Sequence, residues 1–318
     1  MMDNIDCSQK ENIILHPASC ILHDHIYITV FTPAYNRAHL LPRAYESLKR
    51  QGYRDFEWIV VDDGSTDDTE AVVSGWLENQ DFPIRYIKKE NGGKHTAINR
   101  GVNEAKGELF FILDSDDMLT DDALQIVANK YETVRGNETY GGVCGLMRHS
   151  DGTQIGSGLL QNTIDCNSID IRYKYHVSGD LMEVYRTDVL KKFPFPEIQG
   201  EKFCPEQLVW FRIAQKYKLR FFNYIIYTRD YIDGGLTDNI VRVRMNSPIA
   251  SMMCYQEMTT YKAVPFLEKC KAAINYWRFR CCRNNSSDEY APKIGIAYCL
   301  LAPVGWFMHI RDIQRQNR

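Results

Sequence analysis

The sequence lacks the short patterns that identify several common classes of protein. No Gly-x-Gly-x-x-Gly motif follows its first predicted strand, and no Gly-x-x-x-x-Gly-Lys-Ser/Thr loop occurs in its 318 residues, so neither Rossmann dinucleotide binding nor P-loop phosphate binding is expected. Its ten cysteines include no Cys-x-x-Cys pair, which argues against a zinc knuckle and a disulfide framework. The N-terminus is polar and acidic, unlike a signal peptide. We therefore expect a cytoplasmic chain with reduced thiols.

The sequence also has little net charge, and that charge is unevenly distributed. The formal value of −3 gives no bulk attraction to nucleic acid, so no nucleic-acid partner is expected. Residues 261–318 carry ten Lys or Arg and four Asp or Glu, a net charge of +6, which leaves −9 for residues 1–260. An acidic body with a basic tail favours a cation-using site in the body and an anionic surface against the tail.

Two kinds of hydrophobic pattern alternate between residues 28 and 118. Apolar or β-branched runs predict strands at residues 28–31, 56–61, 84–87 and 109–113, with helices between them. Strands separated by helices favour right-handed crossovers and a mainly parallel sheet with helices on both faces, an α/β fold. Beyond residue 120 we expect helices at 121–131 and 207–217, strands at 141–147 and 220–227, and a polar loop at 150–168.

Several acidic residues directly follow predicted strands. Asp114, Asp116 and Asp117 lie within four residues of one another, where their mutual repulsion is costly unless a cation is bound. Mg²⁺ or Mn²⁺ suits such oxygen ligands, although a solvated acidic loop is the alternative. Asp62 and Asp63 follow a second strand, where a carboxylate can accept the N3–H of uracil or cap the next helix. Ligands bind beyond the carboxyl ends of parallel strands, so we expect all five at one sheet edge.

A cation is also available at this edge. Lys94 follows Asn91, Gly92 and Gly93 at the predicted start of a helix, where backbone N–H groups favour anions. With no glycine-rich phosphate loop present, a bound diphosphate would have to be neutralised by metal and side chains. An ordinary surface lysine is the alternative interpretation.

Four motifs in this order resemble the nucleotide-binding half of the family-2 glycosyltransferases, which have the GT-A fold. The resemblance is dense over residues 26–131 and thinner to about residue 240. The motifs are TPAYNR at 32–37, VDDGSTD at 61–67, NGG at 91–93 with AINRG at 97–101, and GE at 107–108 through LDSDD at 113–117. The resemblance implies an inverting, metal-dependent transfer from a nucleotide-sugar, most simply a UDP-sugar with Mn²⁺ or Mg²⁺.

The resemblance also implies roles for individual residues. The uracil base of the nucleotide would lie between Pro33 and Tyr35 and would be bound by Asp63, and Asp62 would support the same pocket. Asp114 would face the ribose and Asp116 the metal ion, with Asp117 in support. The remaining donor-binding residues would be Asn91, Gly93, Lys94 and Ser115.

Inversion needs a general base, and here the sequence departs from the family. Members carry a Glu-Asp pair at the head of a helix, whereas residues 203–212 read FCPEQLVWFR and align Glu206 with the usual Asp. Glu206 is our first candidate, with capping of its helix as the alternative, since a glutamate performs the same proton transfer. Asp180 is the second candidate, more suited to orienting the acceptor, and Glu201 is the third. Residues 229–239 resemble the loop that closes over the donor, or form a surface turn.

The C-terminal region has its own composition. Residues 269–283 interleave aromatic and basic side chains, and residues 294–310 contain no charged side chain. A membrane-spanning helix needs about 20 apolar residues, and this run is shorter and interrupted by Pro303 and Gly305. Attachment at the membrane interface is therefore predicted, with a docking helix as the alternative.

Together these patterns predict an N-terminal extension (1–25), a GT-A domain (26–245) and a helical basic and apolar tail (246–318). The domain divides into a nucleotide-binding half (26–131) and an acceptor half (132–245). The predicted function is sugar transfer to an oligosaccharide acceptor, lipid-linked, in bacterial surface-polysaccharide synthesis at the inner face of the membrane. A nucleotidyltransferase and a non-catalytic nucleotide-sugar or glycan-binding module are the alternatives.

Overall fold

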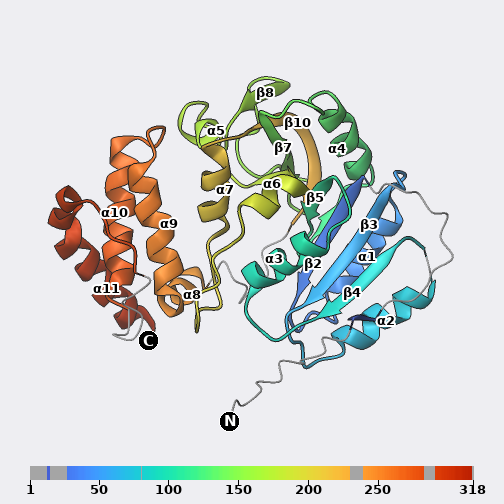
Figure 1. Cartoon of the computed structure of the whole chain (residues 1–318), viewed down its shortest axis with the longest axis horizontal. Helices are drawn as coiled ribbons and strands as arrows, with labels where there is room; N and C mark the ends of the chain where they lie inside the picture. The colour runs from blue at the N-terminus through green and yellow to red at the C-terminus, as the bar shows by residue number, and fades with distance from the viewer. Residues whose placement is uncertain (1–12, 15–26, 80, 230–238, 283–290, 317–318) are drawn as a thin grey trace, which may run out of the picture.

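One large sheet organises the molecule. The computed structural model describes residues 13–14, 27–79, 81–229, 239–282 and 291–316. Within that part the strands form a ten-stranded sheet in the order β1-β4-β3-β2-β5-β9-β7-β10-β6, and β8 pairs with β10 beside this path. Helices flank the sheet, and the C-terminal helices gather at one end of the molecule (Figure 1). The predicted α/β fold class with a helical C-terminal region is confirmed.

The first half of the sheet is parallel, as the alternating pattern predicts. Its four central strands pair in parallel in the order β4-β3-β2-β5, and the short strand β1 joins β4 antiparallel. The elements are β1 (Ile13–Ile14), β2 (Ile28–Ala34), α1 (Leu41–Lys49), β3 (Phe56–Asp62), α2 (Thr69–Asn79), β4 (Ile84–Lys88), α3 (Lys94–Glu104) and β5 (Leu109–Ile112).

Side chains of this half alternate between two helical layers. Phe31 in β2 faces α3, where a Cβ added to Gly101 would lie 2.2 Å from its ring, so the close approach requires glycine. Trp58 in β3 donates its indole N–H to Thr32 at 2.9 Å and lies 6.2 Å from the ring of Tyr45 in α1. Helices therefore cover both faces. One face of α1 is fully buried, formed by Leu41, Ala44 and Leu48.

The second half of the sheet is mixed because of β9, a strand that the sequence patterns did not predict. It lies antiparallel between β5 and β7, while β10 runs parallel to β7. The predicted loop at 150–168 is wrong for its last part, where β8 forms. The elements are β6 (Met118–Leu119), α4 (Ala123–Glu132), β7 (Tyr140–Arg148), β8 (Thr163–Cys166), α5 (Asp170–Tyr173), β9 (Leu181–Arg186), α6 (Thr187–Lys192), α7 (Glu206–Ala214) and β10 (Lys218–Thr228).

The C-terminal helices have a small core of their own, formed by Met252, Tyr276 and Phe279. An ion pair between Arg278 and Asp312, 2.7 Å apart, joins the last two α-helices. None of the described helices is both long and apolar enough to cross a membrane. The predicted domain boundaries stay predictions. The elements are α8 (Ile240–Asn246), α9 (Pro248–Thr260), α10 (Phe266–Arg280), the 3₁₀ helix η2 (Ile296–Leu301) and α11 (Ala302–Gln316).

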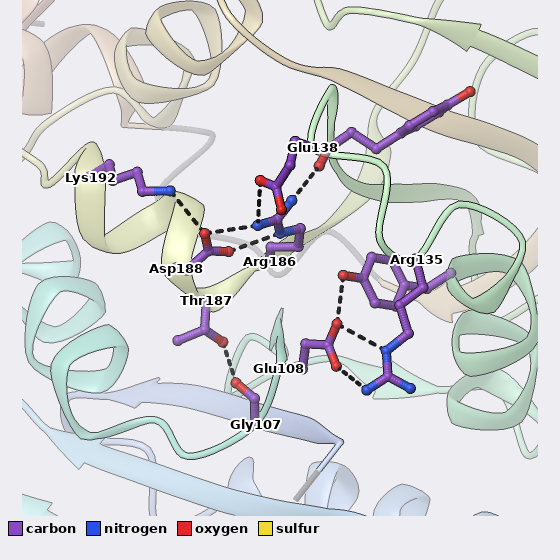
Figure 2. Close-up of polar contacts among 10 residues, drawn as sticks. Gly107, Glu108, Arg135, Glu138, Arg186, Thr187, Asp188 and Lys192 are labelled. Carbon is purple, nitrogen blue, oxygen red and sulfur yellow. Dashed lines mark hydrogen bonds and ion pairs between the residues drawn. The ribbon is translucent and has the colours of Figure 1, made fainter.

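A polar cluster lies at the edge of the sheet where β5 and β7 begin, around a hollow of about 500 Å³. Figure 2 shows its contacts. The carboxylate of Glu108 binds Arg135 at 2.6 Å, and that of Asp188 binds Arg186 and Lys192, each at 2.9 Å. We call this group the back cluster. It comprises Glu108, Tyr131, Arg135, Glu138, Arg186, Asp188 and Lys192.

Candidate functional site

A cavity of about 930 Å³ lies at the opposite edge of the sheet, beyond the carboxyl ends of β2, β3 and β5. We call it the front cavity. The structure brings together around it all the site residues predicted from the sequence except Asp62 and Glu201. These are Pro33, Tyr35, Asp63, Asn91, Gly93, Lys94, Asp114, Ser115, Asp116, Asp117, Asp180 and Glu206.

The end of β2 carries the residues predicted to lie beside the base. Pro33 and Tyr35 both line the cavity, and Tyr35 is 48% exposed. The next residue, Asn36, has a positive φ of 54° and is held there by Ser65, whose hydroxyl accepts its backbone N–H at 2.8 Å. The backbone around Tyr35 is therefore fixed at the cavity mouth.

Asp63 is surrounded by hydrogen-bond donors. One carboxylate oxygen accepts from Lys89 Nζ at 2.7 Å and from the backbone N–H of Gly92 at 2.9 Å. The other accepts from the backbone N–H of Gly93 at 2.7 Å and from the amide of Asn91 at 3.2 Å. Asp63 therefore anchors the turn at residues 91–93, and the N3–H of a bound uracil would have to replace one of these four donors.

Asp62 lies directly beneath, with no exposed surface. Its carboxylate accepts hydrogen bonds from the backbone N–H of Ser65 at 2.7 Å and from the phenol of Tyr86. Burial, together with this carboxylate, raises the pKa of Tyr86, so the phenol keeps its proton and remains the donor. Asp62 supports the turn that carries Asp63 without lining the front cavity.

Lys94 joins the two halves of the site. It follows Gly93, whose φ of 97° and whose closeness to the carbonyl of Lys202 exclude a side chain, since a Cβ would lie 1.9 Å from that oxygen. Its ammonium lies 2.7 Å from Asp114 and 2.8 Å from Glu206. Burial opposes the charge, but the two carboxylates outweigh it and raise the pKa of Lys94. Lys94 therefore stays charged between Asp114 and Glu206.

Asp116 and Asp117, which follow β5 together with Asp114, form no ion pair with a described residue. Burial raises the pKa of Asp117 to about 8, with further contributions from the charges of Asp114 and Asp116, although Tyr227 donates to it at 2.9 Å. Asp116 has no hydrogen bond or ion pair with any residue that the structure describes. Negative charge thus accumulates on oxygen ligands, with Ser115 buried between them, and this arrangement fits a hard divalent cation.

The same residues do not form a complete metal cage. Within the described ranges no group of three or more His, Cys, Asp or Glu side chains is arranged to hold a metal ion. Mg²⁺ and Mn²⁺ sites in phosphate-binding enzymes use one or two carboxylates and take their remaining ligands from water and substrate phosphates. Asp116 with Asp117 therefore fits a cation that arrives with a phosphorylated ligand.

The three candidate bases occupy different surroundings. Glu206 is the first residue of α7, and its carboxylate faces the cavity and pairs with Lys94. Asp180 is 54% exposed and lies 2.5 Å from Arg229. Glu201 lies away from the cavity lining and accepts the first two free backbone N–H groups of α9 at 2.6 and 2.9 Å, so it acts as a helix cap. Of the predicted closing loop at 229–239, residues 230–238 lie outside the described residues.

The wall of the cavity formed by α5, β9 and α7 contains residues that sequence reasoning missed. Arg172 in α5, Glu183 in β9 and Trp210 in α7 line this wall. Burial raises the pKa of Glu183 to about 7. Glu183 lies three residues after the candidate Asp180. It could have been found from the sequence if the β9 segment that follows Asp180 had been recognised as a strand.

Comparisons with known proteins show that this chain is similar to glycosyltransferases. Residues 29–179 match the model of glycosyl transferase family 2. A glucosyltransferase of Campylobacter jejuni, named for the substrate GalNAc(5)-diNAcBac-PP-undecaprenol and a beta-1,3 linkage, is 28% identical over 76% of this chain and 79% of its own length. An uncharacterized glycosyltransferase of Rickettsia felis is 38% identical over 34% of this chain and 18% of its own length.

Solved structures with a similar fold include two chains with a bound nucleotide or nucleotide-sugar. S. aureus TarS 1–349 in complex with UDP has a TM-score of 0.57 and 18% identity, with 92% of each chain covered. The mannosyltransferase PcManGT from Pyrobaculum calidifontis, in complex with GDP-Man and Mn²⁺, has a TM-score of 0.52 and 18% identity over 88% of this chain and 73% of its own. At these identities the likeness establishes the fold.

Proposed function

Because this chain belongs to the family-2 glycosyltransferases with the GT-A fold, we propose that it transfers a sugar from a UDP-sugar to a lipid-linked oligosaccharide, with inversion. The observation that carries the proposal is the front cavity itself, where a carboxylate cluster and a candidate base are joined by one lysine. The acceptor class is supported by the Campylobacter relative, whose name specifies a lipid-linked oligosaccharide and whose similarity extends over most of both chains.

The donor side of the cavity suits a nucleoside diphosphate. Tyr35 would pack against the base, Asp63 would accept the uracil N3–H in exchange for one of its present donors, and Asp114 would bind the ribose. The Lys94 ammonium would bind the phosphates, together with the backbone N–H groups at the start of α3. Asp116, with Asp117, would hold a divalent ion that neutralises the charge building on the leaving phosphate.

Glu206 is proposed as the general base. Its carboxylate would accept the proton of the acceptor hydroxyl while that oxygen attacks the sugar carbon on the face opposite the leaving diphosphate. In the described structure Glu206 is ion-paired with Lys94, which also binds Asp114. A diphosphate that draws Lys94 toward the donor side would therefore weaken this pair and make the base available. Asp180 would orient the acceptor from the opposite wall.

The C-terminal helices are proposed to hold the enzyme against the inner face of the cell membrane. Large apolar side chains are exposed on η2 and α11, including Ile296 at 89% and Leu300 at 85%. Exposed basic residues lie beside them at Lys293, Arg311 and Arg315. An apolar face with a basic border suits anionic lipid headgroups, and it would bring the front cavity near a lipid-carried acceptor.

Co-sedimentation with phosphatidylglycerol vesicles tests this attachment. The double variant Leu300→Ser and Phe307→Ser should stay in the supernatant, because both side chains are exposed and their loss leaves the fold intact. Leu160→Ser, which removes an equally exposed leucine from a distant loop, is the matched control and should sediment like wild type. Equal sedimentation of all three proteins would refute the attachment.

A panel of nucleotide-sugars tests the enzymatic proposal. Wild-type protein with Mn²⁺ should release UDP from one UDP-sugar, and an acceptor carrying a lipid diphosphate should accelerate the release. Release of a sugar 1-phosphate instead, with UMP passed to added pyrophosphate to form UTP, would indicate a nucleotidyltransferase. Binding of a nucleotide-sugar without turnover in the presence of any acceptor would indicate a non-catalytic module.

A further inference from the structure

Glu183 is an unexplained carboxylate in the wall of the front cavity. It is the third residue of β9 and pairs across the ladder with Cys144 of β7. It lines the cavity, yet among the described residues it has no ion-pair partner within 4.0 Å and no hydrogen bond to another residue. The other unpaired carboxylate of this cavity, Asp116, is explained by a metal ion, but Glu183 lies on the acceptor side and is not.

Arg172 lies on the same wall and has free donors of its own. One guanidinium nitrogen, Nη1, donates to the carbonyl oxygens of Val177, at 3.2 Å, and Gly179. Within the described residues the Nε and Nη2 groups make no hydrogen bond. Arg172 attracts Glu183 enough to oppose the rise in its pKa, but the two charges are farther apart than an ion pair. The Glu183 carboxylate, which accepts hydrogen bonds, and the Arg172 guanidinium, which donates them, therefore face the same cavity without contacting each other.

Aromatic side chains complete this wall. Trp210 lines the cavity and packs at 4.7 Å between ring centroids on Tyr185, which fixes its plane. Tyr173 and Phe211 line the same region. Sugars present apolar C–H faces as well as hydroxyl edges, so a rigid aromatic surface beside a polar pair is suited to a pyranose ring.

We propose that Glu183 and Arg172 form a subsite for the acceptor sugar, bridged by one of its hydroxyl or acetamido groups. The O–H or N–H of that group donates to the Glu183 carboxylate, and its oxygen accepts from the free N–H groups of Arg172. The subsite rests on the proposed function and deepens it by assigning the acceptor side to residues of β9 and α5. The subsite takes a neutral saccharide, because Glu183 would repel an anionic group and Arg172 would repel a cationic one.

Saturation-transfer NMR with three methyl glycosides tests the subsite, in the presence of UDP and Mn²⁺. The probes are methyl N-acetyl-β-D-glucosaminide, methyl β-D-glucoside and methyl 2-deoxy-β-D-glucoside. Wild type should give a signal with the first or the second probe, and Glu183→Gln should weaken that binding about 10- to 100-fold, as expected for a lost charged hydrogen bond. Arg172→Lys should weaken it less, because it keeps the charge. The UDP dissociation constant should remain within about twofold in both variants.

The matched control is Glu138→Gln, which removes a carboxylate from the back cluster at the other edge of the sheet and should bind every probe like wild type. Equal saccharide binding by wild type and Glu183→Gln would overturn the subsite, as would the absence of any glycoside signal with wild type. In contrast, failure of wild type to bind UDP or to release it from any UDP-sugar would overturn the proposed function. Once an acceptor is known, Glu183→Gln should raise its KM more than it lowers kcat.

Discussion

The two edges of the sheet differ in how their charged side chains are paired. In the back cluster each carboxylate that lines the hollow has a basic partner: Glu108 pairs with Arg135, Asp188 with Arg186 and Lys192, and Glu138 with Arg186 (Figure 2). In the front cavity Asp116 and Glu183 have none among the described residues. The carboxylates of the back cluster are all paired without a ligand, whereas two carboxylates of the front cavity are not.

This difference separates a structural polar cluster from a binding site. Both regions are hollow and rich in charged residues, so neither shape nor composition distinguishes them. A carboxylate removed from water without a partner destabilises the fold. Such groups occur at functional sites, where a ligand provides the missing charge or hydrogen bond. Asp116 and Glu183, which have no partner among the described residues, are therefore candidates for contact with a ligand.

The largest effect is expected from removing the unpaired carboxylate on the metal side. Asp116→Ala should lower UDP release by about 10³-fold or more, because a divalent ion supplies several kcal/mol of stabilisation to the leaving phosphate. Titration calorimetry of UDP with and without Mn²⁺ should show that the metal no longer strengthens nucleotide binding. Metal-dependent UDP binding retained in the variant would remove Asp116 from the site.

A smaller but still large effect is expected at Glu206. Glu206→Gln keeps the size of the side chain and loses its basicity, so transfer should fall by about 10²–10⁴-fold. UDP binding should change little, because Glu206 contacts the donor side only through Lys94. Unchanged turnover would move the base to Asp180 or to another carboxylate of the cavity.

The third effect concerns stability and its dependence on pH. The pKa of Glu183 is raised from 4.5 to about 7, so the folded protein loses stability as the pH rises between these values. Glu183→Gln should therefore leave the Tm nearly unchanged at pH 4.5 and raise it at pH 8. The corresponding gain in unfolding free energy at pH 8 is at most about 3 kcal/mol. A lower Tm at pH 8 would show that Glu183 is stabilised by a partner.

The smallest effect is expected in the back cluster. Glu108→Gln weakens the hydrogen bonds to Arg135 and Tyr131, so it should cost about 1 kcal/mol of unfolding free energy, measured by urea denaturation. UDP affinity and turnover should match wild type. A loss of activity comparable to that of Glu206→Gln would contradict the distinction between the two edges.

Much of the donor side was predictable because its signals are local. Asp63 and Asp116 follow directly after apolar runs, and the carboxyl ends of parallel strands lie at one edge, so sequence order alone placed them together. The acceptor side was harder to predict. β9 is six residues long and pairs with β5 and β7, which lie far from it in the chain, so no local pattern distinguishes it from a loop.

The sequence by itself determined the α/β class, the parallel first half of the sheet and the group of carboxylates at its edge, since each follows from short-range periodicity. Only the tertiary structure decided the electrostatics of the site: that Lys94 joins Asp114 to Glu206, that Asp63 is already surrounded by donors, and that Glu183 has no partner. The physical reason is that partnership and burial depend on contacts between distant segments, and these contacts determine which charges remain available to a ligand.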